Sequence, residues 1–354
     1  MTLNELKNEH PLVREDIADI CADKGIPWDK LRHSTVLVTG ATGLIGSLLV
    51  KALVYRALIY GDEIKVMAAV RNVEKARTVF RDQLLHEGQL LKFVVCDINS
   101  PISLTEPVDY IVHTASITSS QDYVCKPVDT IMTTLNGTRN ILELARLKNS
   151  RSVAFLSTME IYGKTDKERV TETDSGYLDP LSVRSSYPQS KRLAENLCIA
   201  YHSQYGVDTK IVRLTQTFGP GVAPDDNRVF AQFARSVIEE KDIVLHTSGS
   251  TCRDYLYTAD AVRGILSILL SGKGGSAYNL SNPDSYGSIL DMACICKDIS
   301  GKIDVVFEQN EAEAKKYFGE TKIQLDNSAF NKLNNFKRRS LRDSLIRLIQ
   351  TFPH

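Results

Sequence analysis

The chain has 354 residues, and its 43 Lys and Arg residues are balanced by 43 Asp and Glu residues. A zero net charge without long blocks of one sign argues against a nucleic-acid groove or a polybasic membrane surface, since both need excess positive potential. The 43% hydrophobic fraction is typical of a globular protein. No segment has the pattern of a signal peptide or a membrane span, so we expect a cytoplasmic protein.

The seven cysteines are scattered along the chain and lie mostly in apolar runs, which predicts reduced thiols in a reducing compartment. Cys294 and Cys296 are too close together for the usual zinc half-site and have no partner pair. We therefore expect no metal site.

The first 33 residues precede the first strand pattern, and we expect them to form an N-terminal helical extension. From Thr35 onward, short β-branched runs alternate with helical patterns such as 44–58 and 128–147, which is typical of βαβ units. This pattern predicts an α/β fold of the Rossmann type with a doubly wound parallel sheet. The expected strands are 35–38, 65–70, 92–96, 110–113, 152–156 and 209–214.

After Thr215 the pattern becomes less regular. It predicts a loop at 218–227, a helix at 229–240 and a short strand at 243–246. Another helix is expected from Thr258, and a final basic amphipathic helix near 339–349. We expect residues 34–215, with about 255–272, to form an NAD(P)-binding Rossmann domain. Residues 216–254 and 273–354 are expected to form a smaller C-terminal α/β substrate lobe.

A glycine-rich turn joins the first expected strand to the first helix, with the sequence Thr39-Gly40-Ala41-Thr42-Gly43-Leu44-Ile45-Gly46. Glycine suits such a turn because positive φ is required and because the backbone must approach a pyrophosphate, which rests on the helix N-terminus. The position between a strand and a helix makes this signal strong.

Two further signals carry catalytic side chains. Tyr187 and Lys191 are four residues apart at the start of a helical stretch, so they share one helix face, where the ammonium can lower the pKa of the phenol. Thr158 follows the fifth strand, and a hydroxyl at the carboxyl end of a parallel strand lies where ligands bind in open α/β sheets.

From Thr35 to about Asp260, and more loosely to Phe352, the three motifs together resemble the extended short-chain dehydrogenase/reductases, the NAD-dependent epimerase/dehydratase family that modifies nucleotide sugars. The resemblance implies that Tyr187 is the catalytic base or acid. It also implies that Lys191 binds the nicotinamide ribose and tunes Tyr187, while Thr158 hydrogen-bonds the sugar hydroxyl that is oxidised.

The same resemblance implies a set of cofactor-binding residues, with Asp97 meeting the adenine: Gly40, Thr42, Gly43, Leu44, Ile45, Gly46, Arg71, Asp97, Ile98, Thr114, Ala115, Ser116, Tyr187 and Lys191. For the nucleotide-sugar substrate it implies Gln216, where the family usually has asparagine, and Arg253, whose guanidinium would reach the diphosphate or the sugar. A structural salt bridge to Asp254 is the alternative for Arg253.

The choice between NAD and NADP depends on the residue after the second strand. Members that prefer NAD usually carry an acid there, whereas this chain has Arg71, which could pair with a 2′-phosphate. Members that recycle their own cofactor often hold NAD without that acid. We therefore expect NAD and keep NADP open.

The reaction depends on the two residues after Thr158, where dehydratases carry an acid pair and decarboxylases of nucleotide-linked glucuronic acid carry Ser-Glu. Here they are Met159 and Glu160, and a methionine cannot usefully donate or accept a proton. The segment 180–187 looks most like the decarboxylase branch. We expect an epimerase-type enzyme that oxidises sugar C4, with Glu160 as a second acid or base.

Other readings stay open. A decarboxylase or 4,6-dehydratase comes next, and then an NADPH-dependent reductase of a nucleotide-linked keto-sugar, which Arg71 would suit. A non-catalytic dinucleotide-binding protein is the alternative from another class, although Thr158, Tyr187 and Lys191 are all present. The resemblance also implies a homodimer that pairs through the helices at 128–147 and 187–203.

Overall fold

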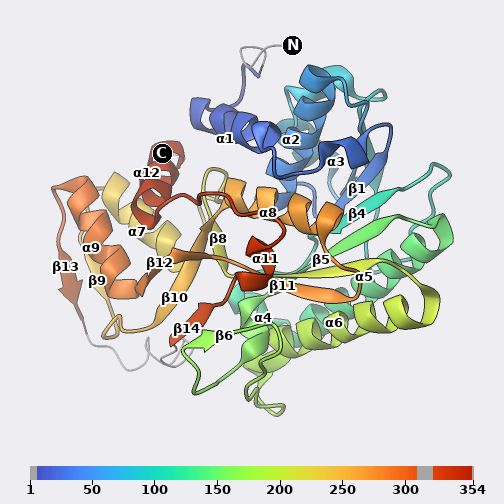
Figure 1. Ribbon diagram of the computed structural model, residues 1–354. Helices are drawn as coiled ribbons and strands as arrows, with labels where there is room; N and C mark the ends of the chain where they lie inside the picture. The colour runs from blue at the N-terminus through green and yellow to red at the C-terminus, as the bar shows by residue number, and fades with distance from the viewer. Residues whose placement is uncertain (1–5, 309–321, 353–354) are drawn as a thin grey trace.

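The computed structural model describes residues 6–308 and 322–352. Within them, seven parallel strands form one sheet in the order β11-β7-β5-β4-β1-β2-β3 (Figure 1). The predicted Rossmann-type fold is confirmed. The strands are β1 (Thr35–Thr39), β2 (Lys65–Val70), β3 (Leu91–Val95), β4 (Tyr110–His113), β5 (Ser152–Thr158), β7 (Thr209–Leu214) and β11 (Ser276–Leu280).

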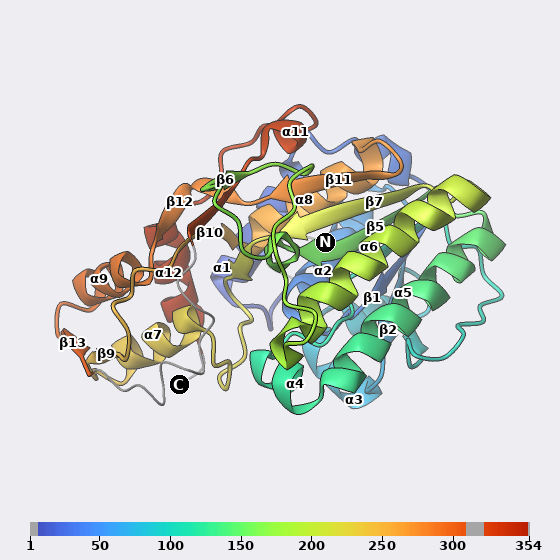
Figure 2. The same ribbon diagram turned by 90° about the horizontal axis from the view of Figure 1, so that it is seen from below.

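Alternate strand residues bury their side chains against different helix layers, because successive side chains point to opposite faces of a sheet. Val36 and Val38 belong to a core with α1 (Pro11–Ala22), α2 (Leu44–Tyr60) and α8 (Thr258–Ser271). Leu37 lies in the core on the other face, beneath two long helices. These are α5 (Pro127–Lys148) and α6 (Ser186–Tyr205), which lie side by side in Figure 2.

Short helices connect these layers at several places. They are α3 (Val73–Val79), α4 (Ser120–Cys125) and α11 (Ser328–Asn331), with single 3₁₀ turns at η2 (Trp28–Leu31), η3 (Gln83–His86), η4 (Met159–Tyr162) and η5 (Val183–Ser185).

A second, smaller sheet lies beyond the carboxyl ends of the main strands (Figure 1). In the described ranges it has the order β12-β10-β14-β6, with β8 paired to β10 and a separate pair of β9 and β13 nearby. A second hydrophobic core joins this region to three helices. The elements are β6 (Arg169–Val170), β8 (Gln216–Phe218), β9 (Ile243–Leu245), β10 (Cys252–Tyr257), β12 (Asn282–Ser288), β13 (Val305–Phe307), β14 (Lys322–Leu325), α7 (Val229–Ile238), α9 (Ile289–Ser300) and α12 (Leu341–Thr351).

One predicted boundary was wrong. Residues 273–354 were assigned to the substrate lobe, but β11 at Ser276–Leu280 pairs in parallel with β7 and is an edge strand of the main sheet. The β11 segment is a short run that follows a glycine-rich turn. Helix α8, which precedes that turn, is the crossover helix that leads into β11, so no separate helical pattern marks β11 in the sequence. The division into a cofactor domain and a substrate lobe otherwise stays a prediction.

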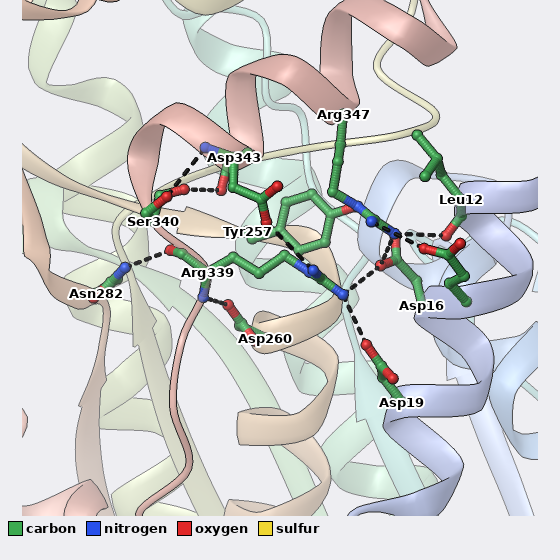
Figure 3. A network of polar contacts seen from close by, with 12 residues as sticks. Leu12, Asp16, Asp19, Tyr257, Asp260, Asn282, Arg339, Ser340, Asp343 and Arg347 are labelled. Atoms are coloured by element: carbon green, nitrogen blue, oxygen red, sulfur yellow. Dashed lines mark hydrogen bonds and ion pairs between the residues drawn. The ribbon is translucent and has the colours of Figure 1, made fainter.

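The N-terminal helix α1 is built into the fold. Ile17 and Ile20 are completely buried in the main core, and α1 packs against α2 and α8. On its other side Asp16 accepts hydrogen bonds from Arg347 of α12 and from Tyr257 of β10, at 3.0 and 2.6 Å (Figure 3). The first helix therefore joins the main sheet to the last helix of the chain.

Candidate active site

The glycine turn places backbone N–H groups at the centre of the main sheet. Gly40 has φ of 63°, and a Cβ there would lie 2.6 Å from the Thr114 hydroxyl oxygen. A Cβ at Gly46 would clash with the carbonyl oxygen of Gly40. Gly43 caps α2 without any side-chain hydrogen bond, so the first N–H groups of this helix can serve a phosphate.

The end of β4 is fastened to this turn. The Thr39 hydroxyl lies 2.7 Å from Nδ1 of His113, and the Thr114 hydroxyl donates to the Thr39 carbonyl at 2.7 Å. The backbone N–H of Ala115 also donates to the Thr39 hydroxyl. Thr114, Ala115 and the following Ser116 are thereby held beside the glycine turn, at the point where the strand order reverses and ligands bind in such sheets.

The remaining predicted cofactor residues follow β2 and β3 at the same edge of the sheet. Arg71 is exposed directly after β2. Asp97 caps its own turn by accepting from the N–H of Asn99 at 3.0 Å. Ile98 packs against Gly137 of α5, so it shapes the backbone of this turn.

The three predicted catalytic residues come together from β5 and α6. The side chain of Tyr187 is buried, and the Thr158 hydroxyl acts on its phenol by partly offsetting the rise that burial causes in its pKa. Lys191 is 3% exposed, and its Nζ lies 5.9 Å from the centroid of the Tyr187 ring. Burial lowers the pKa of Lys191 to about 8, while it raises the pKa of Tyr187 well above its usual range, and the negative charge of Glu160 adds to that rise.

Lys191 contacts β5, the strand that carries Thr158. Its Nζ donates to the carbonyl oxygen of Leu156 at 2.7 Å and lies 4.7 Å from the centroid of the Phe155 ring. Ser157, the next residue in the strand, donates a hydrogen bond from its hydroxyl to the carboxylate of Glu195. Strand β5 and helix α6 are therefore joined by polar contacts at the two residues that precede Thr158.

Glu160 and Met159 separate into different environments although they are adjacent in the chain. Glu160 accepts from Nη2 of Arg184 at 2.9 Å, and its charge acts on Tyr187. Met159 is buried, and its sulfur accepts a hydrogen bond from the Thr215 hydroxyl at 3.3 Å. Of the two residues after Thr158, Glu160 acts on Tyr187 through its charge, whereas Met159 contacts Thr215.

Two contributors to this site carried no sequence signal that we recognised. Tyr123 of α4 stacks on Tyr187 with ring centroids 4.2 Å apart and an angle of 4° between the rings. Arg213 of β7 binds Glu195 with Nη2 2.7 Å from Oε2. An aromatic residue in a short helix and an arginine within a strand look like ordinary packing and surface residues in sequence, because their partners lie far along the chain.

The predicted substrate residues lie on neighbouring strands of the small sheet. Gln216 begins β8, which pairs in parallel with β10, the strand that carries Arg253. Oε1 of Gln216 and Nε of Arg253 are buried without a hydrogen-bond partner among the described residues. Asp254 instead accepts from Ser281 and from the Leu325 N–H, both at 2.8 Å, so an Arg253–Asp254 pair is not formed in the described part of the chain.

The cysteines and the possible membrane spans can be compared with what the sequence predicts. All seven cysteines lie within them and are free thiols. In the described ranges, no helix is long and apolar enough to cross a membrane.

Comparison with known proteins identifies the family of this chain. The model of the NAD dependent epimerase/dehydratase family matches residues 36–281. UDP-glucuronic acid decarboxylase 1 of Arabidopsis thaliana is 32% identical over 332 residues, which make up 93% of this chain and 71% of that protein. UDP-glucuronic acid decarboxylase 1 of Xenopus tropicalis is 30% identical over 283 residues, or 78% of this chain and 63% of that protein.

Solved structures share the fold. The UDP-glucuronic acid 4-epimerase from Bacillus cereus in complex with NAD has a TM-score of 0.74 at 24% identity, covering 90% of this chain and 98% of that one. A dTDP-glucose 4,6-dehydratase from Streptomyces venezuelae with NAD bound has a TM-score of 0.69 at 24% identity, covering 90% and 96%. The family model covers more than half of the chain and the resemblance inferred from the motifs is confirmed: this chain is an enzyme of the NAD dependent epimerase/dehydratase family.

Proposed function

We propose that this enzyme oxidises C4 of a UDP-linked uronic acid with NAD and releases carbon dioxide from the resulting keto acid. The observation that carries the proposal is the convergence of Thr158, Tyr187 and Lys191, with Glu160 and Arg184 beside them. The curated relatives named above are UDP-glucuronic acid decarboxylases. From the sequence alone we expected an epimerase, and these relatives favour the decarboxylase instead.

The residues at the edge of the main sheet fit a dinucleotide. The positive φ of Gly40 and the uncapped start of α2 suit a pyrophosphate, and Thr114, Ala115 and Ser116 lie beside it. Arg71, Asp97 and Ile98 would border the adenosine half, and Tyr187 with Lys191 the nicotinamide half. NAD, when bound, supplies the acceptor for the hydrogen that leaves sugar C4.

The side chains act on the proton of the C4 hydroxyl. Tyr187 accepts this proton while the Thr158 hydroxyl holds the sugar oxygen, and the Lys191 ammonium stabilises the phenolate. The product is a ketone two carbons from the sugar carboxylate. Such a keto acid loses carbon dioxide when the bond between C5 and the carboxylate carbon breaks and its electron pair passes onto the ketone oxygen, after which C5 takes up a proton. Return of the hydride to C4, with return of the proton from Tyr187 to the C4 oxygen, would then leave a product lighter by carbon dioxide alone.

Arg184 and Glu160 fit a uronic acid substrate. A guanidinium recognises a carboxylate through its fork of N–H donors, and Arg184 already binds one carboxylate, that of Glu160. The charge of the Glu160 carboxylate acts on Tyr187, so we assign Glu160 to the proton that C5 receives. Met159 is turned into the interior and contributes no proton.

The second candidate is a C4 epimerase that keeps the carboxylate. It is favoured by Met159, because decarboxylases of the family carry serine there and this chain has no hydroxyl at that position. The 4,6-dehydratase and reductase alternatives stay predictions, whereas the non-catalytic alternative is set aside because the chain belongs to a family of enzymes.

The deciding experiment incubates the purified enzyme with UDP-glucuronic acid and NAD and identifies the product by mass spectrometry. We expect a product lighter by carbon dioxide, whereas an isomer of unchanged mass would establish the epimerase instead. The Tyr187→Phe variant should lose turnover by at least about 100-fold, in the range of general acid–base catalysis. Full turnover in that variant would contradict the assigned role of Tyr187.

We also propose a homodimer formed through α5 and α6. The two helices pack side by side (Figure 2). Both carry large apolar side chains that are exposed. Burial of these groups against a second copy would remove apolar surface from water. They are Val128, Met132 and Leu147 on α5 and Leu193, Ile199 and Tyr205 on α6. Light scattering at micromolar concentration tests the proposal, and a monomeric mass would contradict it.

A further inference from the structure

Arg192 lies on α6 directly after Lys191, and its guanidinium binds two backbone carbonyls. Its Nε donates to the carbonyl oxygen of Ile161 and its Nη2 donates to the carbonyl oxygen of Gly176, both at 2.7 Å. Ile161 belongs to η4, the 3₁₀ turn that also carries Glu160. Gly176 lies at the far end of the loop that follows η4. The half-buried side chain of Arg192 therefore holds both ends of this loop.

The two ends of the loop also contact each other. The Gly176 N–H donates to the carbonyl oxygen of Tyr162 at 2.8 Å, and Lys164 and Tyr177 exchange two backbone hydrogen bonds of 2.8 Å. A Cβ at Gly176 would clash with the carbonyl oxygen of Lys164, so the two backbone segments cross as closely as glycine allows. Arg192 binds at this crossing, where a change in one segment is passed to the other.

The turn η4 is held at its start, at its end and by its carboxylate. At its start, the Thr158 hydroxyl accepts from the Glu160 N–H at 3.2 Å. At its end, Arg192 binds the Ile161 carbonyl oxygen. The Glu160 carboxylate accepts from Nη2 of Arg184 at 2.9 Å. Because η4 is a single turn of 4 residues, a shift of the Ile161 carbonyl would also move Glu160.

The middle of the loop has anchors of its own. Nη1 of Arg213 donates to the carbonyl oxygen of Glu172 at 2.7 Å, and the Asn279 N–H donates to the Glu172 carboxylate at 2.8 Å. These contacts do not involve Arg192. Removal of the Arg192 guanidinium should therefore loosen η4 while the loop stays attached to β7 and β11.

We propose that Arg192 is a positioning residue for Glu160: its guanidinium fixes η4 through the carbonyls of Ile161 and Gly176, and η4 in turn directs the Glu160 carboxylate to the substrate. The inference rests on the proposed role of Glu160 as the acid that protonates C5. Arg192 acts through Glu160 and not on the substrate.

The proposed reaction has two parts, and Arg192 bears on the second. Oxidation of C4 depends on Tyr187 and Lys191, and Lys191 keeps its own bond to the Leu156 carbonyl oxygen at 2.7 Å. Delivery of a proton to C5 depends on Glu160. Loss of the Arg192 contacts should therefore slow the second part and spare the first. The hydrogen taken from C4 would then remain on the cofactor for longer, because C4 regains it only after C5 has taken up a proton.

The test follows single turnovers of UDP-glucuronic acid with the NAD-loaded enzyme, using the absorbance of the reduced cofactor and the mass of the product. In Arg192→Gln we expect the absorbance to rise within about twofold of the wild-type rate and then to decay about tenfold more slowly, because proton delivery has lost its geometry. Arg192→Lys keeps the positive charge and can bind one of the two carbonyls. Its decay rate should lie between those of the wild type and Arg192→Gln.

A double substitution shows whether Arg192 acts through Glu160. Glu160→Gln alone should slow the decay by about 100-fold, in the range of general acid catalysis. In the Glu160→Gln background, Arg192→Gln should slow it by less than about a further twofold, because the group that Arg192 positions is already lost.

Arg56→Gln is the matched control, since Arg56 of α2 also donates to a backbone carbonyl, that of Cys21 at 2.7 Å, but does not bind η4. It should keep both phases at the wild-type rates. Equal slowing of both phases in Arg192→Gln, full additivity with Glu160→Gln, or the same slow decay in Arg56→Gln would each overturn the inference.

Failure of the proposed function is visible separately. If Glu160→Gln decays slowly and Arg192→Gln decays like the wild type, the inference alone is refuted. If Glu160→Gln itself decays like the wild type, the proposed role of Glu160 and the inference are both refuted. A wild-type product of unchanged mass would refute the decarboxylase, and the same double substitution, measured by turnover, would still support or refute the coupling of Arg192 to Glu160.

Discussion

Two buried clusters with the same chemistry hold different parts of this enzyme together. Beneath the site, Glu195 binds Arg213, and Arg213 also donates to the hydroxyl of Tyr162 at 3.0 Å. At the N-terminal helix, Asp16 binds Arg347, and Arg347 donates to the hydroxyl of Tyr257 at 2.9 Å (Figure 3). Each cluster consists of an acid, an arginine and a tyrosine.

The clusters differ in what they connect. Glu195 lies one turn after Lys191 on α6 and accepts from Ser157, the residue before Thr158, so its cluster joins the elements that carry the catalytic groups. The Asp16 cluster joins the two ends of the chain, since Asp16 and Arg347 are 331 residues apart. The same kind of contact therefore supports the proposed catalytic residues in one place and joins the first helix to the last in the other.

The difference between the two clusters is tested most strongly by Glu195→Gln, which should show the largest effect. Removal of one partner of a buried pair leaves the other charge uncompensated, so we expect a loss of about 3 kcal/mol in unfolding free energy. The substitution also changes the hydrogen bond that Glu195 accepts from Ser157, the residue before Thr158. We expect turnover to fall about tenfold or more because Thr158 and Lys191 are then held less firmly. Urea unfolding and initial rates measure the two effects, and unchanged turnover in a folded variant would contradict the distinction.

Asp254 is a buried acid whose described partners are Ser281 and the Leu325 N–H, so it provides a comparison with the two arginine clusters. Burial raises its pKa to about 6 from 3.8, although Ser281 and the Leu325 N–H donate to it. Because the folded-state pKa exceeds the unfolded one, the stability from this group is fully present below about pH 4 and is lost as pH rises through about 6.

We therefore expect the unfolding free energy of the wild type, taken relative to Asp254→Asn, to fall by up to about 3 kcal/mol between about pH 4 and about pH 7. Urea titrations of both proteins across this range measure the difference. A difference that stays constant or rises with pH would show that the pKa of Asp254 is not raised.

The smallest effect is expected for Asp16→Asn, the counterpart of Glu195→Gln in the other cluster. Arg347 keeps Glu15 and the Leu12 carbonyl as acceptors, so we expect a loss of about 2 kcal/mol in unfolding free energy, in the range of one charged hydrogen bond. Turnover should stay within about twofold of the wild type. A loss of turnover as large as that of Glu195→Gln would mean that the two clusters are not functionally distinct.

The sequence by itself determined six of the seven described strands of the main sheet, the glycine turn and the face of α6 that carries Tyr187 and Lys191. These features depend on local spacing: β-branched runs form strands, Gly40 supplies positive φ, and Tyr187 and Lys191 share a face because they are four residues apart. The expected helices at 128–147 and 187–203 correspond to α5 and α6 within two residues at each end.

Only the tertiary structure decided the rest. The place of β11 in the main sheet, the stack of Tyr123 on Tyr187, the support of Glu195 by Arg213 and the closure of Asp16 on Arg347 all join residues that are distant in the chain. No local period records such pairs, because a buried polar contact depends on which elements the folded sheet brings side by side. Local spacing in the sequence therefore predicted where chemistry would occur, whereas long-range packing selected the residues that hold that chemistry in place.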